Sequence, residues 1–109
     1  MKYLITESKL DSAILLYLDN QDFIQIEIGD SIYFVNSEGD EYAQIKYDKD
    51  NSWCYIYHKL INEISSFFSL ELTDSKDVIG RWVENTLQMR VTDTLSSLNQ
   101  IYFLVENTL

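Results

Sequence analysis

Residues 23–57 contain four short, mostly apolar runs with turn sequences between them, and the first run, FIQIEI, alternates apolar and polar side chains from Ile24 onward. A period of two is typical of β-strands that bury one face. We therefore predict strands at residues 23–28, 31–35, 42–47 and 53–57. Gly29-Asp30 is a typical two-residue hairpin turn, and Gly39 provides the left-handed residue that a three-residue turn at 37–39 favours. The four strands are expected to form an antiparallel meander.

These turns predict a strand register. Loops at 29–30, 37–39 and 50–51 place Ile26 opposite Tyr33, Ser31 opposite Ile45 and Tyr33 opposite Ala43. The predicted core face then consists of Ile24, Ile26, Ile28, Tyr33, Val35, Ala43, Ile45, Tyr47, Cys54 and Ile56. The opposite face is mixed and rich in aromatic residues: Phe23, Ile32, Phe34, Tyr42, Trp53, Tyr55 and Tyr57.

Helical spacing of apolar residues flanks this region. It predicts helices at residues 7–19, with Thr6 as N-cap, at 58–70, and from about residue 73 onward. The tail allows two interpretations, a helix capped by Asp93 or an edge strand at 101–105. The predicted fold class is α+β: an N-terminal helix, a four-stranded antiparallel meander, two C-terminal helices and this tail. No linker divides residues 1–109, so we expect a single domain.

The charge balance excludes several classes of function. Eighteen acidic and eight basic residues give a net charge of −10, which argues against direct binding of nucleic acid. One His and one Cys leave few ways to build a metal site, an activated nucleophile or a disulfide framework. No apolar run approaches the roughly 20 residues that a membrane span needs. We expect a cytoplasmic, non-enzymatic protein without cofactor, metal or membrane contact.

Two constellations resemble known sites only in part. Asp48, Asp50 and Ser52 have the first three spacings of a calcium loop, but Trp53 replaces the glycine of the sharp turn and Lys59 replaces the final glutamate. An ordinary polar hairpin loop is the better interpretation. Cys54 and His58 do not form a nucleophile pair, because alternation separates them by two pleats. We interpret them as a buried cysteine and a histidine at a helix start.

Acidic residues are concentrated in the meander. Nine of the eighteen fall within residues 19–50, where only Lys46 and Lys49 oppose them. This concentration predicts a negative patch at one end of the sheet. We expect a protein partner to bind there and on the aromatic face, through Glu38, Asp40, Glu41, Asp48, Asp50, Phe34, Tyr42, Trp53 and Tyr55.

Four segments carry a resemblance: residues 3–8 (YLITES), 33–42 (YFVNSEGDEY), 53–57 (WCYIY) and 77–87 (DVIGRWVENTL). Over residues 1–90 the chain resembles short uncharacterised acidic proteins predicted in marine tailed-phage and metagenomic genomes. The resemblance implies a viral protein in the cytoplasm of a host cell, and it implies no activity.

Two functions remain open at this point. The first is an accessory or anti-defence protein that binds a protein partner, such as a basic host protein whose nucleic-acid-binding surface it masks. The alternative is a small virion or assembly component that forms homo-oligomers through the aromatic sheet face.

Overall fold

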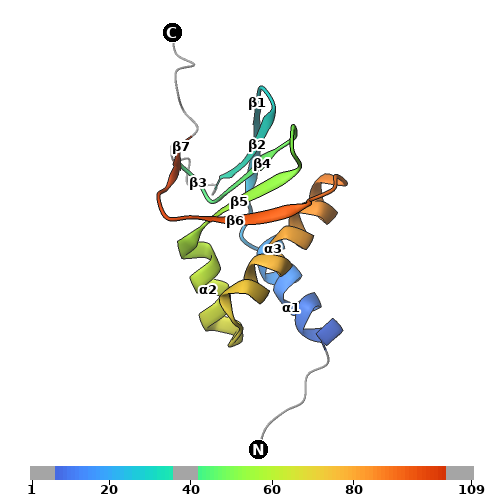
Figure 1. Cartoon of the computed structure of the whole chain (residues 1–109). Coiled ribbons are helices and arrows are strands. Elements are labelled where there is room, and N and C mark those ends of the chain that lie inside the picture. Colours follow the sequence, from blue (N-terminus) through green and yellow to red (C-terminus); the bar gives the residue numbers. More distant parts are fainter. Residues whose placement is uncertain (1–6, 36–41, 103–109) are drawn as a thin grey trace, which may run out of the picture.

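Three helices pack against one face of a mixed β-sheet in the computed structural model, which describes residues 7–35 and 42–102 (Figure 1). The helices are α1 (Glu7–Asp19), α2 (His58–Phe68) and α3 (Leu72–Leu87). The strands are β1 (Ile24–Ile28), β2 (Ser31–Val35), β3 (Tyr42–Ala43), β4 (Ile45–Asp48), β5 (Trp53–Tyr57), β6 (Asp93–Ser97) and β7 (Ile101–Tyr102). The predicted α+β class is confirmed. The predicted N-cap, Thr6, lies outside the described residues.

The main sheet has five strands in the order β1-β2-β4-β5-β6. Its first four strands form the antiparallel meander, but β6 pairs in parallel with β5, so the predicted all-antiparallel, four-stranded sheet was incomplete. A parallel neighbour requires a crossover connection, and α2 and α3 provide it. A C-terminal helix capped by Asp93 was therefore wrong. The alternative prediction was an edge strand at residues 101–105. Ile101 and Tyr102 form β7, which pairs with β3 in a separate two-stranded sheet, and residues 103–105 lie outside the described part of the chain.

The strand register is correct at the first hairpin and wrong at the second connection. Ile26 lies opposite Tyr33 as predicted, but Ser31 lies opposite Asp48, three positions further along β4 than the predicted Ile45. An odd shift exchanges the two faces of a strand. The predicted main-core face of β1 and β2 is therefore wrong: Ile24 and Ile28 are 47% and 40% exposed, whereas Ile32 and Phe34 are buried. Val35 is buried as predicted, but in a second, smaller cluster.

Gln44 interrupts the strand predicted at residues 42–47. Its backbone N–H donates to the carbonyl of Phe34 at 2.9 Å, and its carbonyl accepts from the N–H of Tyr57 at 2.9 Å. Ala43 and Ile45 flank this break, and both are fully buried, but they belong to separate apolar clusters. The break therefore turns one continuous strand into β3 and β4.

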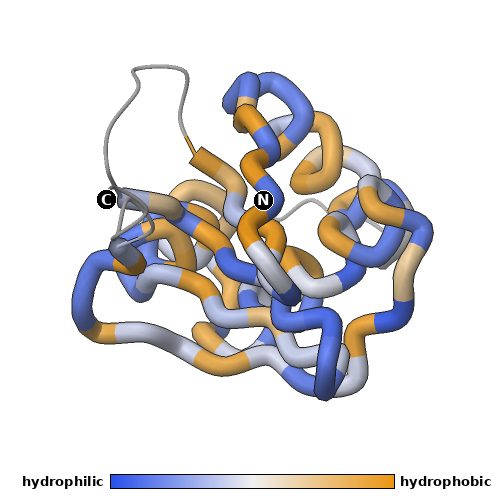
Figure 2. Tube along the Cα trace, turned by 90° about the horizontal axis from the view of Figure 1, so that it is seen from above, coloured by the Kyte–Doolittle hydropathy of each residue, from blue (hydrophilic) through white to orange (hydrophobic). Residues whose placement is uncertain are grey.

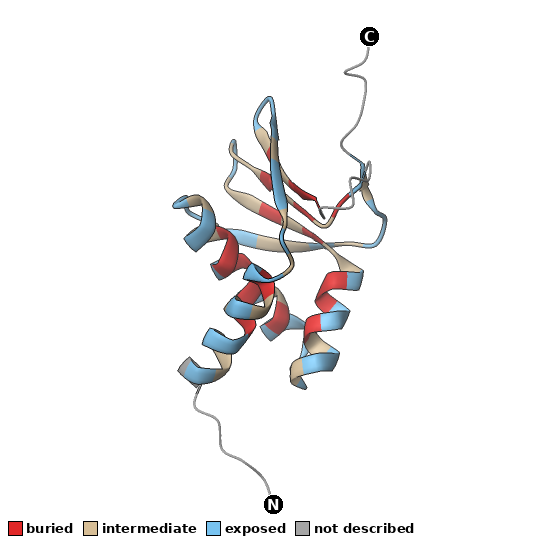
Figure 3. Ribbon diagram, turned by 180° about the vertical axis from the view of Figure 1, so that it is seen from behind, coloured by how far each residue is buried: buried red, intermediate tan, exposed pale blue. Residues whose placement is uncertain are grey.

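The main core lies between the helices and the sheet (Figure 3). Its buried members from the helices are Ile14, Leu18, Leu60, Ile61, Ile64, Val78, Ile79, Trp82 and Val83. Its buried members from the sheet are Ile32, Phe34, Ile45, Tyr47, Cys54 and Ile56. The apolar residues that recur at helical spacing are thus mostly buried or half-buried, as predicted, but Ala13 is exposed and Phe67 is 69% exposed.

Polar contacts fix the elements around this core. The indole N–H of Trp82 donates to Asp19 Oδ1 at 2.8 Å, which joins α3 to the end of α1. The hydroxyl of Tyr47 donates to the carbonyl of Arg90 at 2.7 Å, which holds the chain between α3 and β6. Among the described helices, none is long and apolar enough to cross a bilayer.

Candidate functional site

The sheet face opposite the three helices is here called the open face, and no helix within residues 7–35 and 42–102 covers it (Figures 1 and 3). Strand pairing arranges its side chains in rows that run across the sheet. The first row is Ile28, Ser31, Asp48, Trp53 and Asp93. The second row is Ile26, Tyr33, Lys46, Tyr55 and Leu95. The third row contains Ile24, Val35, Tyr57 and Ser97.

Part of this face has a small core of its own. Val35 and Ala43 are buried in a second cluster, against which Ile26, Tyr33 and Ile101 pack. Strands β3 and β7 thus cover the third-row end of the face around β2. In Figure 2, the tube alternates between apolar and polar positions along much of the sheet, as expected for strands with two different environments. The first and second rows make up most of the open face.

The second row already holds a cation on aromatic rings. The Nζ atom of Lys46 lies 5.8 Å from the ring centre of Tyr33 and 5.6 Å from that of Tyr55. Both distances are within the range of cation–π attraction. The aromatic rings of the open face are therefore arranged so that an ammonium group can lie over them.

The first row places an indole ring between two acidic residues. Asp48 and Asp93 are the partners of Trp53 on the strands to either side, and the rings of Trp53 and Tyr55 are 6.4 Å apart. Asp48 Oδ1 accepts the N–H of Asp50 at 3.0 Å, and Asp93 Oδ1 accepts the N–H of Thr94 at 2.9 Å. Within the described part of the chain, the second oxygen of each carboxylate has no hydrogen-bond partner.

Negative charge gathers at this end of the sheet. The backbone N–H of Lys49 donates to the carbonyl of Asp30 at 2.8 Å, which brings the β1–β2 and β4–β5 turns together. The ammonium of Lys49 is hydrogen-bonded to Glu27, and this bond raises the pKa of Lys49. In residues 7–35 and 42–102, no salt bridge engages Asp48 or Asp93. Their charge therefore remains available to a ligand on the open face.

The structure places the predicted partner-binding residues in different parts of the molecule. Asp48, Trp53 and Tyr55 lie on the open face, and Asp50 lies in the adjoining turn. Phe34 is fully buried against Trp82, with ring centres 5.2 Å apart, so its assignment to an exposed face was wrong. The three remaining acidic candidates, Glu38, Asp40 and Glu41, lie outside the described residues.

Tyr42 is 36% exposed, but it belongs to the small β3–β7 sheet rather than to the first two rows. Its ring centre is 5.4 Å from that of Tyr102.

The sequence interpretation missed Asp93 and Leu95 because it did not predict β6. It also missed an exposed aromatic patch on the helical side, where the rings of Phe67 and Tyr17 stack at 5.3 Å. One signal for this patch was present. Phe67 and Phe68 are adjacent, and neighbouring residues of a helix cannot both point at the same core.

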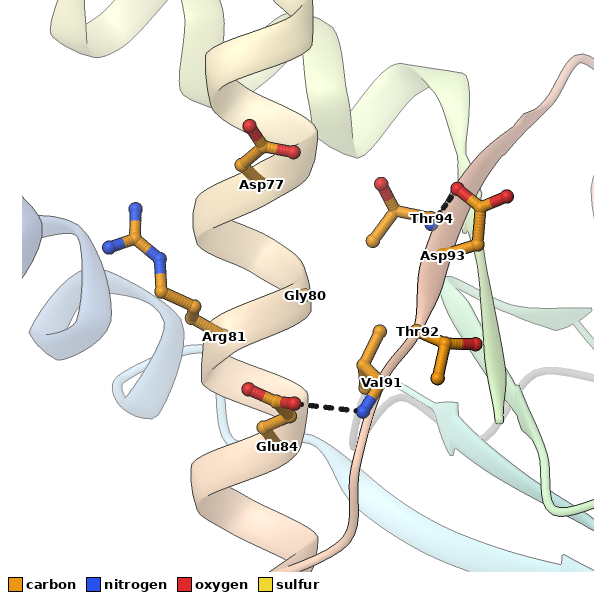
Figure 4. Close-up of a pocket in the computed structure, with 8 residues that line it drawn as sticks. All are labelled: Asp77, Gly80, Arg81, Glu84, Val91, Thr92, Asp93 and Thr94. Atoms are coloured by element: carbon orange, nitrogen blue, oxygen red, sulfur yellow. Dashed lines mark hydrogen bonds between the residues drawn. The ribbon is translucent and has the colours of Figure 1, made fainter. Parts of the chain in front are cut away.

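A groove of about 380 Å³ lies between α3 and β6 (Figure 4). Two charged side chains along it are engaged in structural contacts: Glu84 accepts the N–H of Val91 at 2.9 Å, and Arg81 bonds Asp11 at 2.7 Å. The side chain of Asp93 points away from α3. Because these charged groups are already bonded within the chain or point out of the groove, we do not interpret the groove as a ligand-binding site.

Metal and nucleophile chemistry find little support in the described residues. They contain no cluster of three or more His, Cys, Asp or Glu side chains that could hold a metal ion. Ser52, the third residue of the calcium-like spacing, adopts a positive φ of 61° in the hairpin turn. Cys54 is fully buried, and desolvation raises the pKa of its thiol to about 12, which suppresses the thiolate. His58 begins α2, so the interpretation of this pair as buried cysteine and helix-start histidine is confirmed.

Comparisons with known proteins assign no family to this arrangement. The chain matches no protein family, no curated protein and no solved structure. The functional argument therefore rests on the open face itself.

Proposed function

We propose that this chain is a non-enzymatic protein-binding module whose contact surface is the open face. The observation that carries the proposal is a sheet face that no described helix covers, on which Trp53, Tyr55 and Tyr33 are each only partly buried. Tyr and Trp are enriched among the residues that contribute most to binding energy at protein interfaces. Ile28, 40% exposed, extends the apolar surface to the sheet edge.

The charge of the chain selects the kind of partner. A net charge of −10 and the carboxylates of the first row repel an acidic surface and attract a basic one. Together with the resemblance to phage proteins, this supports an accessory role in which the open face covers a basic surface of a host protein. The binding would be strongest at low ionic strength.

A capture experiment with matched variants tests the proposal. The wild type, a Trp53→Ser/Tyr55→Ser variant and a Phe67→Ser control are each used to capture proteins from a host-cell lysate. The captured protein is then purified and its affinity measured by calorimetry. We expect the open-face variant to lose the partner. The control should retain it, because Phe67 is an exposed aromatic on the helical side. Equal affinity of all three folded proteins would reject the open face as the contact surface.

Self-assembly is a second candidate function, and the position of β1 favours it. This strand is an edge of the sheet, and Ile24 and Ile28 on it are exposed. The two-residue turn makes Ile28–Ser31 the closing hydrogen-bonded pair, so the N–H groups of Gln25 and Glu27 point to the outer edge of β1, where no described strand pairs. An edge of this kind can pair with a second copy.

Light scattering coupled to size-exclusion chromatography tests this candidate. Glu27→Pro removes an outward N–H without removing a ladder bond within the chain, whereas Glu27→Ala keeps the N–H. Both variants lose the carboxylate and its bond to Lys49, so they differ in the backbone N–H and the proline ring. Assembly through β1 predicts oligomers for the wild type and Glu27→Ala, and monomers for Glu27→Pro. A monomeric wild type at millimolar concentration would eliminate this candidate.

A further inference from the structure

We propose that the open face binds an arginine or lysine side chain of its protein partner against the indole ring of Trp53, between Asp48 and Asp93. This inference rests on the proposed function and specifies what the partner must supply. It makes the first row, rather than the whole acidic end of the sheet, the determinant of recognition.

The strand register sets the dimensions of this site. Asp48, Trp53 and Asp93 are direct neighbours on β4, β5 and β6. Adjacent strands are about 4.8 Å apart, so the two acidic residues start from backbones about 10 Å apart, with the indole between them. A cation above the ring is therefore within side-chain reach of both carboxylates. The planar guanidinium of arginine can stack on an indole and donate hydrogen bonds on two sides, which favours arginine over lysine.

The neighbouring row shows that this face accommodates such a contact. The ammonium of Lys46 lies over the rings of Tyr33 and Tyr55 at 5.8 and 5.6 Å. Trp53, one row away, offers the aromatic side chain that attracts cations most strongly. Lys49 lies next to Asp48 in the β4–β5 turn, but its ammonium is already bonded to Glu27. The first row thus has the aromatic ring and two carboxylates, and its cation would come from the partner.

A metal ion fits this site poorly. Hard cations require six or more oxygen ligands at about 2.0–2.6 Å, and carboxylates that start about 10 Å apart on either side of an indole cannot close such a shell. An organic cation needs no such shell, because it is bound through stacking and separate hydrogen bonds. The geometry therefore favours a cationic side chain.

The two tryptophans of the chain provide a direct measurement and an internal control. The probe is the peptide acetyl-Arg-Arg-Arg-amide, and acetyl-Gln-Gln-Gln-amide is the uncharged comparison. In ¹H–¹⁵N spectra we expect a saturable shift of the Trp53 indole signal with the arginine peptide only. The Trp82 indole is bonded to Asp19 and only 5% of that residue is exposed, so its signal should stay in place. Absence of a Trp53 shift, or equal shifts of both indoles, would overturn the proposal.

Paired variants separate a local effect from the net charge. Asp48→Asn/Asp93→Asn removes both carboxylates but keeps the oxygen atoms that accept the N–H groups of the turn and of β6. Asp22→Asn/Asp74→Asn makes the same change of charge at two exposed positions, before β1 and in the first turn of α3. We expect the first variant to bind the arginine peptide about tenfold more weakly, equivalent to about 1.4 kcal/mol, and the second to bind almost as the wild type does. Equal weakening of both variants would show general attraction by the charged chain and would refute the site.

The same variants distinguish this inference from the proposed function. If the captured partner is lost with Trp53→Ser/Tyr55→Ser but binds Asp48→Asn/Asp93→Asn normally, the open face is the contact surface and the cation site is wrong. If both variants lose the partner and Asp22→Asn/Asp74→Asn retains it, both proposals are supported. If no variant changes the affinity, both are wrong.

Discussion

The close approach of β6 to α3 predicts an unusual response to the substitution Gly80→Ala. A Cβ atom added at Gly80 would lie 2.6 Å from Cγ2 of Thr94 and 3.7 Å from Cγ1 of Val91. The first distance is far inside van der Waals contact, whereas the second is ordinary. Alanine in the middle of a helix normally stabilises it by about 1 kcal/mol relative to glycine. Here the clash should outweigh that gain.

The magnitudes follow from these opposing effects. Forcing an additional methyl group into a packed interface costs about 1–3 kcal/mol. The net effect of Gly80→Ala should therefore be a destabilisation of about 1 kcal/mol. Thr94→Ser removes the Cγ2 atom itself. In that background the helix propensity should dominate, and Gly80→Ala should become neutral or stabilising by up to about 1 kcal/mol.

A double-mutant cycle measures this reversal. The free energies of unfolding of the wild type, both single variants and the double variant are obtained from denaturant titrations followed by circular dichroism. We expect a coupling energy of about 1–2 kcal/mol between the two sites, in the range found for residues in direct contact. Because Thr94 pairs with Cys54 on β5, this result would also test the parallel placement of β6. A stabilising Gly80→Ala in the wild-type background, with coupling below about 0.5 kcal/mol, would refute the packing argument.

Three further predictions concern the core and the turn. Phe34→Ala should lower the free energy of unfolding by about 3–5 kcal/mol and the partly buried Ile26→Ala by less than about 2 kcal/mol; equal losses in denaturant titrations would contradict the observed faces. Burial raises the pKa of Cys54 from 9.0 to about 12, so the thiol stays protonated in the folded state while the unfolded chain ionises. Stability should therefore fall by about 1.4 kcal/mol per pH unit between about pH 9 and 12, and Cys54→Ala should lack this component; parallel pH profiles of the two proteins would disprove it. Millimolar calcium and EDTA should give the same melting temperature, because Asp48 and Asp50 supply only part of a calcium shell; a rise of several degrees with calcium would restore the calcium-loop hypothesis.

The elements that could be predicted from the sequence are those with local causes. Helix α1 follows from the helical periodicity of its apolar residues. The β1–β2 hairpin follows from the turn at Gly29-Asp30, in which Gly29 adopts a positive φ of 61° that suits glycine. The pairing of Asp48 with Trp53 follows in the same way from the short β4–β5 turn. In each case, only a few residues separate the strands that pair.

The core face of β1 and β2 could not be obtained in this way. It depends on the connection between Val35 and Ile45, where Gln44 bonds to both Phe34 and Tyr57 and divides the expected strand. The observed pairing of β2 with β4 is shifted by three residues from the predicted one, and a shift by any odd number exchanges the side chains on the two faces of the strand. Alternation fits both arrangements almost equally well, because Ile24, Ile26 and Ile28 are as apolar as Ile32 and Phe34. Only the packing of the helices decides between them.

The proposed cation site shows how local and tertiary information combine. Asp48 reaches Trp53 through a hairpin, but Asp93 reaches it only because α2 and α3 return the chain to the other side of β5. Neither periodicity nor charge pattern marks Asp93, since the sequence of β6 is short and mostly polar. A site that joins a local pair to a residue beyond a helical crossover depends on the integrity of the whole fold. Recognition of the arginine peptide would therefore be lost on unfolding, which distinguishes a preformed site from simple attraction to an acidic chain.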